Sequence, residues 1–164
     1  NNVVSILDSH LTGPDNNTGR FHIYYNASAN FITGGSYQDP DNFYYHTNAY
    51  QCNSCTTSQA SDNVSLDRDD MDGAPGTETI TITKVRSGTY RYSVHDYTNR
   101  NNSSSTKLAE SGTTVNVFYN NTQTTYNVPN SAGNLWEVFT FDGSTGALTA
   151  SDNMTAHSNY DTIQ

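Results

Sequence analysis

The sequence predicts an all-β protein, an antiparallel two-sheet β-sandwich, immunoglobulin-like or related, with about nine strands. Asn, Thr and Ser make up 62 of the 164 residues. These residues favour turns and strand surfaces, because Asn and Ser compete for backbone hydrogen bonds and Thr is β-branched. No stretch shows sustained helical periodicity. Short apolar or aromatic runs instead alternate with Gly, Asn, Asp and Pro, as in sandwiches and barrels.

The expected strands follow one another at spacings that suit hairpins. They span residues 3–11, 20–26, 42–47, 63–67, 77–85, 88–97, 113–120, 123–128 and 135–142. Alternation within these runs predicts the buried positions. The predicted core is Ile6, Phe21, Ile23, Ile80, Ile82, Tyr90, Tyr92, Val94, Val115, Val117, Leu135 and Phe139.

The domain prediction is a single β-sandwich domain over residues 1–150, followed by a polar C-terminal tail over residues 151–164 without evident core positions. The length suits one domain with one buried core. The chain enters an extended apolar pattern almost at once, without Met, which indicates a removed leader or a segment of a longer protein. Because an open sheet edge invites strand addition, a missing or donated edge strand is one way for such a domain to join its neighbours.

The acidic balance restricts the expected partners. Asp and Glu total 16 against 7 Lys and Arg, which gives a net charge of −9. Nucleic acid and anionic lipid both require a basic patch, so neither is expected to bind, and no run is apolar enough for membrane insertion. Seven sequons permit an exported, glycosylated surface, although this composition also produces such triplets by chance. They are Asn16, Asn26, Asn63, Asn101, Asn102, Asn120 and Asn153.

Cys52 and Cys55 form a lone C-x-x-C motif. The preferred interpretation is a small disulfide that pins a surface loop, because disulfides are typical of exported proteins. Two inert thiols are the alternative. A four-sulfur zinc site needs a second pair, and no βαβ pattern indicates a redox centre. His46 adds only a weak third metal ligand.

An acidic loop carries four aspartates within six residues, just before a Gly turn. Oxygen ligands at this spacing can wrap a hard cation such as calcium. The Gly and Glu positions of an EF-hand are missing, however, and the alternative is a solvated acidic loop. The four residues are Asp67, Asp69, Asp70 and Asp72.

The histidines form a better-defined candidate site than the acidic loop. Asp8 and His10 point to one face, because alternate strand residues do. If the first two strands pair in a register centred on Asn16, His10 lies opposite His22, and His95 could join from the wet face of a neighbouring strand. Neutral imidazoles with a carboxylate suit zinc or another transition metal. The alternative is that each histidine bonds a loop carbonyl or a carboxylate.

Several of these motifs occur together in one known family. The succession "LDSHLTGP", "GRFHIYY", "LDRDDMDGAPGTETITI", "SGTYRYSVHDY" and "SGTTVNVFYNN" resembles a family of functionally uncharacterised β-sandwich domains from prokaryotic secreted and cell-surface proteins. The match runs from about Ser5 to Thr149. Family members typically carry a longer acidic run where this chain has "VVSI", and the insertion with the two cysteines is not typical.

The resemblance implies an exported sandwich module without established catalysis, usually one of several in an envelope-attached chain. In the Phe-His, Leu-Asp-x-Asp and Val-His motifs, polar residues fall on recurring positions of the family, and the Asp-x-His motif matches the family element only in part. The resemblance thus supports one shared site. That site could hold a divalent metal, zinc or calcium, or act as a hydrogen-bonded latch that responds to mild acid. Its candidate ligands are Asp8, His10, His22, Asp67, Asp69 and His95.

Three functions fit these observations. The first and preferred one is an extracellular structural or adhesive module of a cell-surface protein or filament, whose 12 Tyr supply contact area to other copies or modules. The second is a carbohydrate-binding module that stacks glycan on exposed aromatics. The third is a metal-dependent hydrolase, which is least expected because no activated nucleophile or general base can be named. The candidate sugar-stacking residues are Tyr44, Tyr45, Tyr50 and Trp136. The alternative is that these aromatics fill the core, which is the commoner fate of a strand Trp.

Overall fold

A computed structural model describes residues 5–14, 20–25, 64–68, 70 and 76–163. The fold is all-β, with antiparallel pairing throughout these residues. The strands are β1 (Leu7–Pro14), β2 (Arg20–Ile23), β3 (Val64–Arg68), β4 (Thr79–Ile82), β5 (Thr89–Asp96), β6 (Thr114–Tyr119), β7 (Thr122–Asn127), β8 (Leu135–Asp142) and β9 (Ala147–Thr155). A four-residue helix, α2 (Lys107–Glu110), precedes β6, and the 3-10 helix η2 (Tyr160–Thr162) follows β9.

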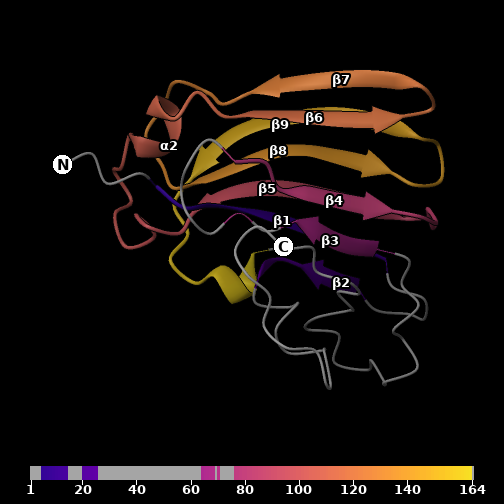
Figure 1. Cartoon of the computed structure of the whole chain (residues 1–164), viewed down its shortest axis with the longest axis horizontal. Helices are drawn as coiled ribbons and strands as arrows, with labels where there is room; N and C mark the ends of the chain where they lie inside the picture. The colour runs from indigo at the N-terminus through magenta and orange to yellow at the C-terminus, as the bar shows by residue number, and fades with distance from the viewer. Residues whose placement is uncertain (1–4, 15–19, 26–63, 69, 71–75, 164) are drawn as a thin grey trace.

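Eight of the nine expected strands are confirmed, and the ninth, at residues 42–47, lies outside the described residues. Five strands form one sheet in the order β2-β1-β5-β8-β9, and two hairpins, β3-β4 and β6-β7, form separate two-stranded sheets. Both hairpins lie over one face of the larger sheet (Figure 1). The larger sheet therefore has an inner face under the hairpins and an outer face on the opposite side.

Alternation along the central strands separates the two faces of the larger sheet. In β1, Leu11 joins the hydrophobic core while its neighbour His10 does not. Phe21 and Ile23 of β2 are in the same core as Leu66 of β3. The even-numbered residues of β1 and β2 therefore face outward, away from the hairpins.

The predicted core is largely confirmed. Seven of the twelve residues are buried, and Ile80, Ile82, Tyr92 and Val117 are half-buried against the core. Ile6 is outside this cluster, because it precedes β1 in the phase of the outer face. The buried residues that the prediction omitted include Leu66, Leu108, Trp136, Val138 and Phe141.

A β-bulge in β8 explains most of the errors that the core prediction made on that strand. The pairing of β8 with β9 shifts between Glu137 and Phe139, so the alternation changes phase there. Trp136, Phe139 and Phe141 consequently all reach the inner core. Leu135 is buried as predicted, but it pairs with His95 and thus lies toward the outer face.

The predicted polar tail at residues 151–164 is wrong. The strand β9 extends across residue 150 and pairs with β8 from Ala147 to Thr155. Ile163, near the end of the described chain, is 2% exposed. The segment looks polar because β9 is an edge strand with exposed side chains, so that backbone pairing and not apolar alternation holds it in place. In the part of the chain that the structure describes, no helix is long and apolar enough to cross a membrane.

Candidate functional site

The outer face of the larger sheet brings four predicted site residues together. Asp8 and His10 lie on β1, His22 on β2 and His95 on β5. β1 lies between the other two strands and pairs with both. Asp8 is directly opposite His95 in the β1-β5 ladder. The prediction that these strands gather their polar side chains on one face is confirmed.

The predicted register of β1 and β2 is wrong by two residues. His22 pairs with Thr12, not with His10, and the ladder continues to Pro14 opposite Arg20. A shift of two keeps the same side chains on the same face, and diagonal neighbours across a ladder stay within reach of long side chains. The contact between His10 and His22 therefore survives the error.

Two imidazoles bond each other inside this face. His10 Nδ1 and His22 Nε2 are 2.9 Å apart. One nitrogen must donate and the other accept, so at least one ring is neutral. The ring of His95 meets the ring of His10 edge-on, with centroids 5.7 Å apart. We call His10, His22 and His95 the histidine cluster.

Tyr24 completes the cluster, although the sequence analysis did not select it as a site residue. Its ring stacks on His22 with centroids 4.3 Å apart and on His10 at 5.2 Å. Tyr24 is two residues beyond His22, so the same alternation that placed His22 could have placed it. Its hydroxyl donates a hydrogen bond to the carboxylate of Asp161, which lies in η2.

The C-terminal segment after β9 covers the histidine cluster. The main-chain carbonyl of His157 lies 2.9 Å from His95 Nε2 and accepts its hydrogen bond. The ring of Tyr160 contacts those of Tyr25 and Tyr97. His10, His22 and His95 are consequently 1%, 3% and 0% exposed. The three rings are therefore closed off from bulk solvent in this structure.

A buried amide fixes the start of this covering segment. Asn134, 1% exposed, precedes β8. Its side-chain oxygen accepts from the backbone N–H of His157 at 2.7 Å, and its amide nitrogen donates to the carbonyl of Arg100 at 2.9 Å. No motif indicated this role, because the two partners lie 23 and 34 residues away along the chain.

Burial keeps the cluster neutral. Loss of hydration lowers the pKa of His22 to about 4, against an opposing effect of Asp161. Burial likewise lowers the pKa of His10 well below its usual range, and the neighbouring His22 and His95 lower it further. The pKa of His95 is lowered mainly by burial, and its bond to the His157 carbonyl opposes the change. All three rings are therefore uncharged at neutral pH.

His10 and His22 bond each other and not a shared third group. Among the residues that the structure describes, no group of three or more His, Cys, Asp or Glu side chains could hold a metal ion. Two of the best donors, His10 Nδ1 and His22 Nε2, already bond each other. Three other imidazole nitrogens are buried without a hydrogen-bond partner: His10 Nε2, His22 Nδ1 and His95 Nδ1.

The predicted neighbourhood of the acidic loop and the histidines is wrong. Asp67 lies on β3, in the hairpin layer over the inner face, and accepts a hydrogen bond from the Thr81 hydroxyl. The larger sheet separates it from the outer-face histidines. The motif pattern in the sequence does not show on which side of the larger sheet a residue lies. Asp69 and Asp72 lie outside the described residues.

Other predicted sites have mixed outcomes. Cys52, Cys55 and His46 lie outside the described residues, as do Asn16, Asn26 and Asn63. Four sequon asparagines are described, and all four are exposed: Asn101, Asn102, Asn120 and Asn153. The surface around them is thus open to a glycan.

The aromatic residues proposed for sugar stacking are only partly described. Trp136 is 0% exposed and belongs to the core, so its predicted stacking role is wrong. A strand Trp with an apolar sheet face above it buries its large ring area instead. Tyr44, Tyr45 and Tyr50 lie outside the described residues. Phe118 on β6 is a large exposed aromatic, at 75%.

Comparisons with known proteins do not identify the class of this site, so its description depends on geometry. No protein-family model matches the chain, and neither curated proteins nor solved structures provide a match.

Proposed function

We propose that the chain is an extracellular structural or adhesive module of a cell-surface protein or filament, with an immunoglobulin-like or related sandwich fold. The observation that carries the proposal is the closure of the histidine cluster, at 3% exposure or less. Its groups bond one another and the covering segment, which suits a latch that holds the fold together. Catalysis requires access to a reacting group, so the closed cluster favours a structural role over a hydrolase.

The described surface also supports an exported module. Its strands expose Thr and Asn more than charge, and four sequon asparagines are open to solvent. The chain has a net charge of −9, so copies repel each other where their charged side chains meet. Surfaces of Tyr and Thr supply contact area between copies with little of this repulsion. Other copies or other modules of a surface protein are the partners that this surface fits.

Immunogold labelling of intact source cells tests the location. An antibody raised against the purified chain should label the cell exterior or its filaments without permeabilisation. Mass spectrometry of the native protein should find a glycan on at least one of the four exposed sequons, and Asn127, an exposed asparagine outside any sequon, is the internal control. Label that requires permeabilisation, with no glycan at any sequon, contradicts the proposal.

A transition metal in the cluster is the second candidate, and the three imidazole nitrogens without partners favour it. Neutral imidazole is the ligand form that zinc needs. A metal would have to separate the bonded His10 and His22 nitrogens. Elemental analysis of the purified chain should then give one zinc per chain, lost in the His10→Asn variant, and a chelator should lower the melting temperature. Absence of stoichiometric metal together with a melting temperature unchanged by chelator rejects this candidate.

A further inference from the structure

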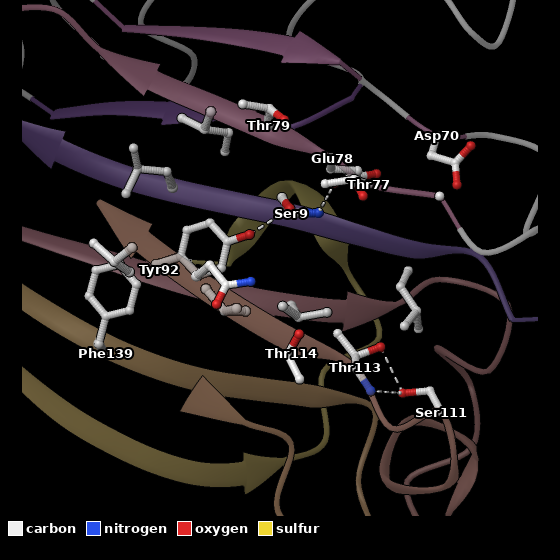
Figure 2. Close-up of a pocket in the computed structure, with 18 of the residues that line it drawn as sticks. Ser9, Asp70, Thr77, Glu78, Thr79, Tyr92, Ser111, Thr113, Thr114 and Phe139 are labelled. Carbon is white, nitrogen blue, oxygen red and sulfur yellow. Dashed lines mark hydrogen bonds between the residues drawn. The ribbon is translucent and has the colours of Figure 1, made fainter. Parts of the chain in front are cut away.

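A groove crosses the inner face of the larger sheet between the two hairpins. It has a volume of about 1430 Å³, which exceeds the roughly 300–1,000 Å³ of small-molecule pockets. Its floor is made by side chains of β1, β5 and β8, including Leu11, Tyr92 and Phe139. Figure 2 shows Tyr92 and Phe139 in the floor, with residues that lead into β4 on one side and residues that lead into β6 on the other. The groove therefore has room for a segment of polypeptide.

The walls of the groove are the inner strands of the two hairpins. β4 and β6 line it along their whole lengths, whereas no residue of β3 or β7 does. In the described part of the chain, β4 pairs only with β3, and β6 only with β7. Each wall therefore turns a strand edge without a ladder partner toward the groove, and such edges invite strand addition.

The directions of the two walls indicate how many strands the groove takes. β4 and β6 run the same way (Figure 1), and the described strand pairs are all antiparallel. An antiparallel layer that joins β4 to β6 needs an odd number of strands between them, and one is the smallest. With one strand added to two from each hairpin, this layer matches the five strands of the larger sheet. The added strand would run opposite to β4 and β6.

The groove is aromatic at the end where β4 and β6 finish. Tyr119, the last residue of β6, packs against Phe141 with ring centroids 5.0 Å apart, and Tyr90 packs against the same ring at 5.6 Å. These three residues line the groove together with Val85, which follows β4. The charged side chains among the described lining residues all come from segments that precede β4 or β6. The aromatic end therefore suits uncharged, apolar side chains.

The opposite end, where β4 and β6 begin, is acidic. Glu78 comes directly before β4 and accepts a hydrogen bond from the backbone N–H of Ser9 in the floor. Asp70 and Glu110 also line the groove, whereas Lys107 is the single cation among the described lining residues and bonds Glu110 at 2.6 Å. The lining thus has an excess of negative charge, on a chain of net charge −9. It complements a basic segment and repels an acidic one.

We propose that the groove between β4 and β6 is an acceptor for one extended strand of a partner protein, apolar at alternate positions and basic at its C-terminal end. Because the strand runs opposite to β4 and β6, it begins at the aromatic end and finishes beside Asp70 and Glu78. Its backbone pairs with both hairpins, and its alternate side chains lie on the floor. This inference rests on the proposed role as an adhesive module and specifies the chemistry of its partner.

Binding of labelled synthetic peptides, measured by fluorescence anisotropy, tests the proposal. The forward peptide alternates Val with Thr and ends in two Lys, and the reversed peptide has the same composition with the two Lys first. The wild-type chain should bind the forward peptide at least about tenfold more tightly, because only this order brings Lys to the acidic end in the antiparallel direction. A forward peptide with N-methylated backbone amides should not bind, because it cannot pair with the strand edges.

A variant in the β6 wall shows whether the peptide binds in the groove. Val117→Lys places a long cationic side chain there and should weaken forward-peptide binding at least about tenfold. The matched control is Thr149→Lys, at an exposed position on β9 outside the groove, which should bind as wild type does. If Val117→Lys prevents folding, as judged by Trp136 emission, Ile80→Lys in the opposite wall replaces it.

A second variant tests the acidic end. Glu78→Gln removes one negative charge and keeps an acceptor for the N–H of Ser9. It should reduce the preference for the forward over the reversed peptide, because that preference depends on the charge at this end. Glu137→Gln, which removes the same charge on β8 outside the groove, should leave the preference unchanged.

The proposal is overturned if the wild-type chain binds no peptide, or if it binds the forward, reversed and N-methylated peptides equally. Dimers in sedimentation velocity that Val117→Lys abolishes, without peptide binding, would assign the groove to a second copy and also overturn it. Exterior immunogold label would in either case leave the surface role standing. Forward-peptide binding together with interior label would support the acceptor site and reject the surface role.

Discussion

At the scale of single residues, the histidine cluster is a set of basic groups kept uncharged by burial. Each ring has lost its hydration, and the rings lie near enough to repel one another when protonated. The bond from His10 to His22 also requires a lone pair on one ring. Protonation therefore favours the unfolded chain, in which all three rings meet water.

The stability of the protein should accordingly fall in mild acid. The pKa of His22 is lowered from 6.5 to about 4, so the unfolded state binds the proton first as pH decreases. Its contribution is complete above pH 6.5, decreases between pH 6.5 and about 4, and changes no further below. At about 1.4 kcal/mol per pKa unit, His22 alone accounts for roughly 3 kcal/mol. Urea unfolding followed by Trp136 fluorescence measures this loss.

The His22→Asn variant should show a shallower decrease over that range. Asn153→Ala is the control, because it replaces an exposed, non-titrating side chain on β9; its slope should match wild type. Equal slopes for wild type and His22→Asn would show that His22 does not carry the pH dependence.

At the scale of elements, the segment after β9 acts as the cover of the outer face. Hydrogen bonds hold it from the amide of Asn134 and from His95, both at His157, and from Tyr24 at Asp161 in η2. These bonds connect it to parts of the chain that are distant in sequence. The cover is what turns a polar sheet face into a buried one.

The Asn134→Ala variant should loosen this cover. It leaves the N–H of His157 and the carbonyl of Arg100 without their buried partner, which costs about 2–3 kcal/mol. Urea unfolding should report that loss, and amide hydrogen exchange at His157 should accelerate. Asn153→Ala, which removes an exposed amide, should change stability by no more than about 0.5 kcal/mol. Unchanged exchange at His157 in Asn134→Ala would reject the latch.

At the scale of the whole molecule, the two faces of the larger sheet have different contacts. Its inner face carries the apolar core and the groove, and its outer face carries the histidine cluster. The two hairpins share the inner face without pairing to each other.

The strands were predictable because their signals are local. Alternation and turn residues mark β4, β5 and β8 within a few positions, and the shared face of Asp8 and His10 follows from alternation alone. The phase change in β8 and the edge strand β9 were not predictable, because a bulge and backbone pairing leave little trace in side-chain pattern.

By itself, then, the sequence determined that the chain forms antiparallel strands and which strands carry its histidines, since side-chain periodicity encodes both. Only the tertiary structure decided that His10 contacts His22 diagonally, that Asp67 lies across the sheet from them, and that residues after β9 close the cluster. Register, the choice of layer and long-range cover depend on contacts between distant segments, and no local pattern records those contacts.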